Sequence, residues 1–472
     1  MELVQCAEGY FLQVMDKMLE VIGGGVEYQQ FQEELRDSLN SLGAQVCGLV
    51  LEGMDKYLME NRQERKGWVI ERREDEKSIL TQFGTVRYKR TYYSNKQTGE
   101  NAYLVDRMAR IASHEKVDGI VKGKLVEIAA SRPYRESGKE WGGEIVSGQT
   151  VMKSIRGFDA GKVGLPEVEL KRQIKTLYIE ADEDHVSGRD GKKREPKLVY
   201  VHEGWNWKNK RVMLKHPYYI AGMYKRADEL WTQVWEYMDA TYDLKGVEKI
   251  FIAGDGAKWI RQGQEVIPGA IYVLDRYHLE QYIRRAVGND YESRKAIWAG
   301  IKESSQEKVI AGLKQADNKS AGRRRDWVVK AVKYISNNWD GIEAYKKYPE
   351  HLGSNAEGHV GHILSNRLSR APQSWGEIGI NQMSKLRAMK ANNCSIFQEY
   401  VEQKKPVLSV IKVCEKAIVE ERRRIKKAIR LEVYDNMPAL SAGRLTQLRR
   451  ALRGLSRHIV VYFQPDSFLY TA

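Results

Sequence analysis

Several features that would place the chain in a familiar class are missing from its sequence. No apolar run approaches the roughly 18 residues that span a bilayer. The opening stretch, MELVQCAEGYFLQVMDKM, has no basic region followed by an apolar block, so we expect a cytoplasmic protein without a secretory signal or a membrane partner. The phosphate-binding motif GxxxxGK[ST] does not occur, which argues against a nucleotide-binding fold of that kind.

Cysteine is scarce and scattered. The four cysteines are Cys6, Cys47, Cys394 and Cys414, and none of them forms a CxxC pair. This spacing argues against a zinc knuckle and a disulfide framework, so we interpret the cysteines as buried or inert free thiols.

Charge and apolar residues are plentiful. The chain has 472 residues, of which 42% are hydrophobic and 30% charged, enough for about three soluble globular domains. Lysine and arginine number 78 against 63 acidic residues, a formal net charge of +15. Such an excess favours a polyanionic partner, because phosphates release counterions when basic side chains bind them.

Residues 1–110 are expected to form a helical segment followed by a β-hairpin. Apolar residues recur at steps of three and four, which predicts one stripe on a helix that either packs within the chain or forms a dimer seam: Phe31, Leu35, Leu39, Leu42, Val46 and Leu49. Residues 68–74 and 83–93 are rich in β-formers. Arg87 and Lys89 share one face of the second strand, where they suit either solvent or a DNA backbone.

Residues 111–170 contain three short helical patterns and a linker. The patterns cover 116–130, 133–143 and 147–158, with Ser147 as a plausible N-cap of the third. The arrangement is similar to a helix-turn-helix whose last helix would offer Lys153 and Arg156 to a DNA groove. The alternative is an ordinary three-helix packing unit.

Residues 171–287 carry strands and helices in a characteristic order. Three strands are predicted at 174–182, 197–205 and 210–222, and two more, at 250–254 and 269–275, alternate with helices. This order predicts a mixed sheet and is also that of a ribonuclease H-like core.

The remaining sequence is predicted to be helical. Residues 288–353, which include Trp298, indicate a helical insertion, and residues 354–405 resume the core. Residues 406–472 form a basic helical tail whose positive side chains suit solvent or phosphates.

Two predicted strands end in a carboxylate. Asp182 ends the first strand and Asp255 follows the fourth, and these strands would be neighbours in the mixed sheet. Two adjacent carboxylates repel each other unless cations lie between them, and oxygen ligands suit Mg²⁺. A pair of such ions about 3.5–4 Å apart supports phosphoryl transfer. A single strand-end aspartate could instead cap a turn or a helix.

The residues alone leave part of this site open. Glu180 and Asp184 flank Asp182, which we prefer because it is the strand-end member. No third carboxylate stands out among the many glutamates. Asp275 and His278 are three residues apart at a predicted helix start, so they share a face. His278 could bind a carboxylate or a phosphate, or the pair could be a structural cap.

The chain resembles the ISLre-type family of bacterial insertion-sequence transposases, also catalogued as an uncharacterised protein family. The resemblance rests on five stretches in order, which cover most of residues 170–395: LYIEADEDHV (177–186), GDGAKWI (254–260), VLDRYHLEQYI (273–283), NAEGHVGHILSNRLSR (355–370) and QMSKLRAM (382–389). That family is similar to Mutator-type DDE transposases, which share a ribonuclease H-like core with an all-helical insertion.

The resemblance implies a function and a set of site residues. Asp182, Asp255 and Glu357 would be the catalytic carboxylates and the ligands of two Mg²⁺ ions, for which Mn²⁺ could substitute. His278 would be catalytic and Asp275 would support it. The partners would be the terminal inverted repeats of an element and target DNA, bound by a homodimer or higher oligomer. Trp298 of the insertion would then stack on an unpaired base, unless it is a core residue.

Two other functions remain compatible with the same sequence. A ribonuclease H-like nuclease would cut DNA without joining it and would use the same carboxylates. A DNA-binding regulator derived from a transposase would tolerate a decayed acidic site, whereas all three carboxylates are present here.

Overall fold

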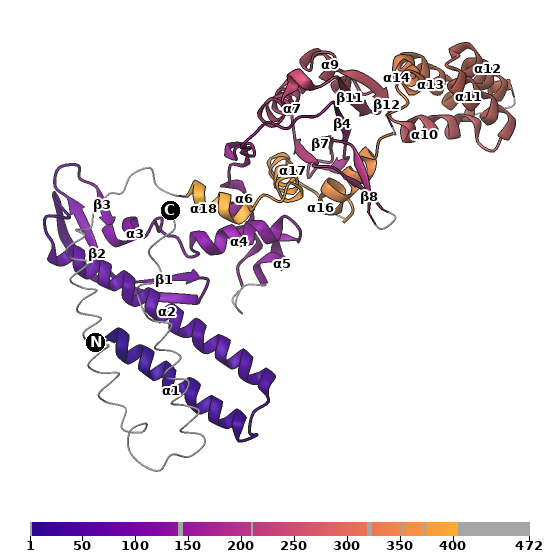
Figure 1. The fold of residues 1–472 in the computed structure, drawn as a ribbon. Helices are drawn as coiled ribbons and strands as arrows, with labels where there is room; N and C mark the ends of the chain where they lie inside the picture. The colour runs from indigo at the N-terminus through magenta and orange to yellow at the C-terminus, as the bar shows by residue number, and fades with distance from the viewer. Residues whose placement is uncertain are drawn as a thin grey trace. The chain divides into compact units, whose positions relative to one another are not determined.

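The computed structural model describes residues 2–139, 145–208, 211–318, 323–351, 353–371 and 373–404 (Figure 1). The chain divides into two compact units, and the break falls between Lys116 and Val117. The basic tail expected at 406–472 lies outside the described residues. No described helix is long and apolar enough to cross a membrane.

The first unit is a helix pair packed with a small antiparallel sheet. Its elements are α1 (Glu2–Ile22), α2 (Tyr28–Glu60), β1 (Trp68–Thr81), β2 (Gly84–Asn95), β3 (Asn101–Tyr103) and α3 (Leu104–Met108). The sheet order is β1-β2-β3, and α2 contacts both α1 and β2. Five of the six apolar stripe residues of α2 are half-buried and Leu39 is exposed, which favours packing within the chain.

The predicted basic face of the first unit is partly neutralised. Arg87 and Lys89 are exposed on β2, as expected. Lys89 lies opposite Glu76 in the β1–β2 register, and its Nζ is 3.4 Å from a carboxylate oxygen of Glu74. The acidic neighbours on β1 make this face a weaker attractor of phosphate than the sequence of β2 alone indicates.

The second unit begins with the three short helices that the sequence predicts. They are α4 (Gly119–Ala129), α5 (Tyr134–Lys139) and α6 (Gly148–Arg156), and the turn η1 (Ala160–Lys162) follows. The hydroxyl of Ser147 accepts a hydrogen bond from the Thr150 amide, so the predicted N-cap is confirmed. These helices contact α17 (Glu377–Ala391) and α18 (Ile396–Gln403), so they pack with the core of the second unit.

A five-stranded mixed sheet forms the centre of the second unit. Its strands are β4 (Thr176–Glu183), β7 (Lys197–His202), β10 (Tyr218–Gly222), β11 (Lys249–Gly254) and β12 (Ile271–Leu274). The order is β10-β7-β4-β11-β12, with β4 antiparallel to β7 and parallel to β11. The predicted mixed sheet is therefore confirmed, and the strands that carry or precede Asp182 and Asp255 are neighbours.

Two short hairpins interrupt the sheet strands. They are β5 (Val186–Ser187) with β6 (Lys193–Arg194), and β8 (Trp205–Lys208) with β9 (Arg211–Leu214). The single third strand predicted at 210–222 is in fact β9 and β10. The strand is interrupted between them at His216, which has a positive φ of 46°, and at Pro217, which has no amide hydrogen to donate.

The two faces of the sheet have different coverings. Ile179 of β4 points into an apolar core together with residues of α7 (Ala227–Thr241), including Trp231. After α7 the chain forms the short helical elements η2 (Leu244–Gly246), α8 (Lys258–Arg261) and α9 (Gly263–Val266). Because side chains alternate along a strand, Glu180 and Asp182 lie on the other face.

The insertion predicted at 288–353 consists of helices joined by short turns in its described residues. After α10 (Arg276–Val287) come α11 (Tyr291–Glu303), α12 (Gln306–Asn318), α13 (Arg323–Asn337) and α14 (Trp339–Lys347). The chain then returns through α15 (Ala356–Val360), the π-helical turn η3 (Gly361–Ser365) and α16 (Asn366–Leu368). Trp298 is half-buried against the apolar core, which favours its structural interpretation over base stacking.

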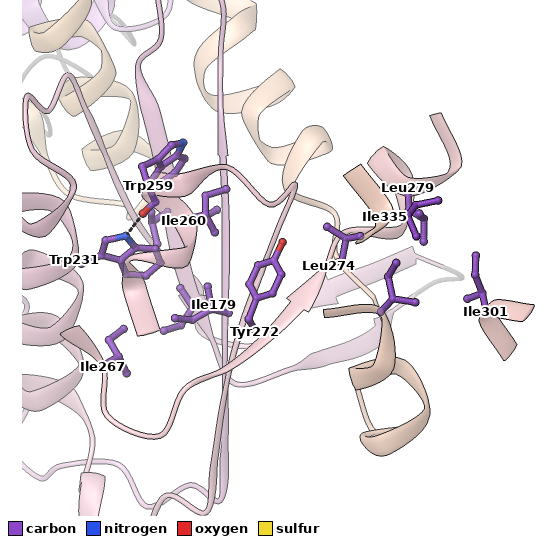
Figure 2. Close-up of a cluster of buried hydrophobic side chains, with 14 of the residues drawn as sticks. Ile179, Trp231, Trp259, Ile260, Ile267, Tyr272, Leu274, Leu279, Ile301 and Ile335 are labelled. Carbon is purple, nitrogen blue, oxygen red and sulfur yellow. Dashed lines mark hydrogen bonds between the residues drawn. The ribbon is translucent and has the colours of Figure 1, made fainter. Parts of the chain in front are cut away.

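Trp231 is the largest fully buried side chain of this core. It has no exposed surface, and its indole nitrogen donates a 2.7 Å hydrogen bond to the Trp259 carbonyl (Figure 2). Trp231→Ala should lower the free energy of unfolding by about 3–5 kcal/mol, because it leaves a cavity and an unpaired carbonyl. Trp207, which is 76% exposed, provides the matched control. Trp207→Ala should change this free energy by less than about 0.5 kcal/mol. Urea titrations of both variants and of the wild-type protein measure the two changes.

Candidate metal centre

Two carboxylates meet at one edge of the central sheet. Asp182 is the penultimate residue of β4, and Asp255 directly follows β11. The strands run parallel, and Ala253 pairs with Glu180, so their ends come to the same edge. The expectation that these two strand ends are adjacent is therefore confirmed.

Asp182 is buried with one oxygen unsatisfied. Asp182 is 6% exposed, and its Oδ1 accepts a 2.8 Å hydrogen bond from the Glu183 amide. Its Oδ2 has no hydrogen-bond partner among the described residues. Burial raises the pKa of Asp182 to about 7, helped by the charges of Asp255 and Glu357 and opposed by the Glu183 amide and His278. An ionised, unsatisfied oxygen in this place suits a bound cation.

His278 lies beside the carboxylate of Asp182, and the ring nitrogen Nδ1 of His278 contacts Asp275. Asp275 caps α10 by accepting from the Tyr277 amide at 3.1 Å, and its second oxygen lies 2.8 Å from Nδ1 of His278. Asp275 therefore caps α10 and also contacts Nδ1 of His278, so that Nε2 is the ring nitrogen that remains for another partner. Burial opposes a charged imidazole, but the Asp275 hydrogen bond and the nearby carboxylates of Asp182 and Asp255 raise the pKa of His278 to about 9.

One ligand atom each from Asp182, His278 and Glu357 lies within 4.8 Å of the other two. Glu357 comes from α15, which begins after the insertion, so three distant parts of the chain converge here. From the sequence we expected Asp255 to be a ligand together with Asp182 and Glu357, with His278 beside them. In the structure, His278 and not Asp255 is grouped with Asp182 and Glu357. The Oδ1 atom of Asp255 instead accepts from the Ala257 amide at 2.8 Å. Asp255 is nevertheless close enough for its charge to affect the pKa values of Asp182 and His278.

Asp184, the sequence alternative to Asp182, resembles it in one respect, because its Oδ2 also has no hydrogen-bond partner among the described residues. Its Oδ1 accepts hydrogen bonds from the His185 amide at 2.9 Å and from the Ser369 hydroxyl at 3.0 Å. Asp184 does not belong to the group of three ligand atoms. The geometry therefore favours Asp182 over Asp184 as the first member of the site.

The insertion holds the strand-end loops that carry these residues. Tyr334 of α13 donates a 2.6 Å hydrogen bond to the Asp255 carbonyl, and Tyr345 of α14 donates one of 2.6 Å to the Leu274 carbonyl. Gly256 has a φ of 92°, and a Cβ atom there would lie 2.4 Å from Oδ1 of Asn338. The positive φ and the close approach of the Asn338 side chain together favour a glycine after Asp255.

Glu180 is the residue of this region to which sequence reasoning gave no role. It is 3% exposed and binds Ser354 and Asn355, just before Glu357 in the chain. Its only sequence signal is its membership of the acidic run EADED, which does not distinguish it from its neighbours.

None of the candidate DNA-contact residues belongs to the group of ligand atoms found among the described residues. Lys153 and Arg156 are exposed on α6 of the second unit, as a helix-turn-helix would require and as solvation also explains. Arg87 and Lys89 belong to the first unit and Trp298 to the insertion.

Comparison with known proteins connects the chain to one family. Residues 22–405 match the family described as Uncharacterised protein family (UPF0236). Two UPF0236 proteins of Caldanaerobacter subterraneus subsp. tengcongensis are similar to the chain over 96% of its length. One is 35% identical and is covered over 97% of its own length, and the other is 36% identical and covered over 98%. A Streptococcus gallolyticus protein named for the vanSb 3′ region is 27% identical over 82% of the chain and 88% of its own length.

The geometry predicts opposite effects of Asp182→Asn with and without metal. In EDTA the variant should melt at a higher temperature than the wild-type protein, because the amide removes a buried charge that is repelled by Asp255 and Glu357. Added Mn²⁺ should raise the melting temperature of the wild-type protein but not of the variant, because ligand binding stabilises the folded state by mass action.

Asp184→Asn is the matched control in the same thermal-shift series. It removes a carboxylate two residues away that is bound to Ser369, so it should keep the wild-type response to Mn²⁺. If Mn²⁺ failed to raise the melting temperature of Asp184→Asn but raised that of Asp182→Asn normally, Asp184 and not Asp182 would be the ligand contributed by β4 and the residues after it.

Proposed function

Because the chain belongs to the uncharacterised protein family UPF0236, whose name assigns no activity, the site has to supply the function, and we propose that the protein is a DDE transposase. It would bind the ends of an insertion sequence, cleave DNA strands and join them to target DNA. One observation carries the proposal: the unsatisfied Oδ2 of Asp182 belongs to a carboxylate that is grouped with Glu357 and His278 beside Asp255.

The strand order supports a ribonuclease H-like core for this enzyme. The first of the five strands, β4, is central, antiparallel to the second and parallel to the fourth. The helices of residues 288–347 lie between the second and third carboxylates in the chain, as the resemblance to Mutator-type transposases implies. The net charge of +15 suits a DNA substrate.

The names of the relatives add an independent argument. One relative carries eleven locus designations of a single bacterium in its name, and another carries four. We interpret these as copies of nearly one gene dispersed in one genome, which transposition would produce.

The residues present fit divalent cations. Asp182, Asp255 and Glu357 would hold two Mg²⁺ ions or, in their place, Mn²⁺, through carboxylate oxygens. When bound, such ions activate water or a DNA 3′-hydroxyl and stabilise the leaving oxygen in phosphoryl transfer. His278, held by Asp275 and cationic at neutral pH, would bind a phosphate oxygen of the cleaved strand. His278 could instead serve as a nitrogen ligand, which Mn²⁺ accepts more readily than Mg²⁺.

Replacing any one of the three carboxylates by its amide should abolish cleavage and joining. Purified protein would be incubated with the end DNA of its element and Mg²⁺, and nicked, excised and joined products resolved. Asp182→Asn, Asp255→Asn and Glu357→Gln should each reduce both reactions by at least about a hundredfold, and double variants should lose little more, because the residues act as one unit. Retained DNA binding would show that the variants are folded.

The same assay separates the alternatives. Wild-type protein that cuts without joining would be a nuclease, and protein that binds end DNA without Mg²⁺-dependent cleavage would be a regulator. Asp184→Asn should remain active as the matched control. Full activity in all three amide variants would refute the transposase proposal.

DNA binding should depend on α6 more than on β2. Lys153→Ala with Arg156→Ala should weaken binding of the full chain to end DNA and lower the salt slope by about 2, because two phosphate contacts are lost. Arg87→Ala with Lys89→Ala should have a smaller effect, since Lys89 is already paired with Glu74. Filter binding over a salt series measures both, and equal losses would favour the β2 face as a contact.

A further inference from the structure

Glu180 is a buried carboxylate with an unusually complete set of hydrogen bonds. Its Oε2 accepts from the Tyr200 hydroxyl at 2.5 Å, the Ser354 hydroxyl at 2.7 Å and the Asn355 amide at 2.7 Å. Its Oε1 lies 3.1 Å from Nε2 of His202, a residue with no exposed surface. Each of the two oxygens therefore has at least one partner.

The carboxylate of Glu180 belongs to a residue that is 3% exposed, and His202, Tyr200 and Ser354 surround it. A buried polar group with several partners is costly to disturb, because removing one partner leaves it less well satisfied. Such a network fixes the positions of the groups that donate to it.

Two of these donors mark the start of the chain segment that carries Glu357. Ser354 and Asn355 immediately precede α15, and the Ser354 hydroxyl also accepts from the Ala356 amide at 3.2 Å. Glu180 thus ties the start of α15 to β4, two residues before Asp182 on the same strand face. A negative charge at a helix start is also electrostatically favourable.

Glu357 itself has no comparable support. It is exposed, and no hydrogen bond to its carboxylate is found within the described residues. Its place beside Asp182 and His278 therefore depends on the backbone of α15. Among the described residues, the ties from Ser354 and Asn355 to Glu180 link that backbone to the strand that carries Asp182, and His359 of the same helix lies 3.1 Å from the Tyr219 hydroxyl of β10.

We propose that Glu180 is a positioning residue, which sets the distance between Glu357 and Asp182 by anchoring the start of α15 through Ser354 and Asn355. It does not touch metal or DNA. Its loss weakens metal binding because Glu357 no longer meets Asp182 in one fixed geometry. The inference rests on the metal centre of the proposed function and assigns a role to a residue outside that centre.

Mn²⁺ affinity of the full-length protein tests this role. Ser354→Ala removes one donor to Glu180 with little change in volume, and Glu180→Gln removes the charge while keeping the shape. Each should lower the affinity for Mn²⁺ about tenfold by calorimetric titration, the low end of the 10–100-fold loss that follows removal of groups supporting metal ligands. Their combination should cost less than the product of the two, because both act through one contact.

Two serine variants serve as controls. Ser354→Thr keeps the hydroxyl and should restore most of the affinity. Ser365→Ala removes a hydroxyl from the same helical run, where it contacts only the Val360 carbonyl at 3.4 Å, and should leave the affinity unchanged. Melting temperatures in EDTA would be recorded for each variant, so that a loss of fold is distinguished from a loss of metal affinity.

The outcomes separate this inference from the proposed function. Normal Mn²⁺ affinity in Ser354→Ala and Glu180→Gln, with affinity lost in Asp182→Asn and Glu357→Gln, would overturn the positioning role and leave the metal centre intact. A lowered melting temperature without a change in affinity would make Glu180 structural only and would also overturn it. Normal affinity in Asp182→Asn and Glu357→Gln would overturn the metal centre and the positioning role together.

Discussion

The parallel pairing of β4 with β11 is the constraint on which the rest of the second unit depends. In parallel strands the carboxyl ends meet at one edge, so the residues that end β4 and follow β11 are brought together without any contact between their side chains. Asp182 and Asp255 are 73 positions apart in the chain and reach the same edge for this reason alone. His278 follows because β12 pairs with the other side of β11 and delivers α10 to the same end.

Glu180 and Asp182 show how environment gives two carboxylates on one strand face opposite properties. Both are buried, and burial by itself opposes the charge of each. Glu180 has donors for both oxygens and its pKa lies below the usual value. Asp182 has one backbone donor, an unpaired oxygen and two acidic neighbours, and its pKa rises to about 7. Both oxygens of Glu180 have hydrogen-bond partners within the protein, whereas the unpaired oxygen of Asp182 suits a bound cation.

The helical insertion belongs structurally to the site although it interrupts the core in sequence. Tyrosines of α13 and α14 bind the carbonyls of Asp255 and Leu274, and Asn338 contacts Gly256. These contacts fix the loops that follow β11 and β12. The insertion also determines where the chain returns to form α15, and therefore where Glu357 can lie.

Alternation, helical periodicity and turn residues are local signals, so the order of strands along the chain, the helical insertion and the strand ends that carry Asp182 and Asp255 could be predicted from the sequence. It could not resolve β9 from β10, since both lie in one β-forming stretch. The strand-end position favoured Asp182 over Asp184, but the sequence could not show that His278 joins Asp182 and Glu357 in one group of ligand atoms, and it did not reveal the contacts of Glu180. Those contacts depend on which side chains face each other across strands and helices far apart in the chain. Only the tertiary structure brings Ser354 to Glu180 and His278 to Asp182, because local periodicity carries no information about a contact between segments separated by a hundred residues.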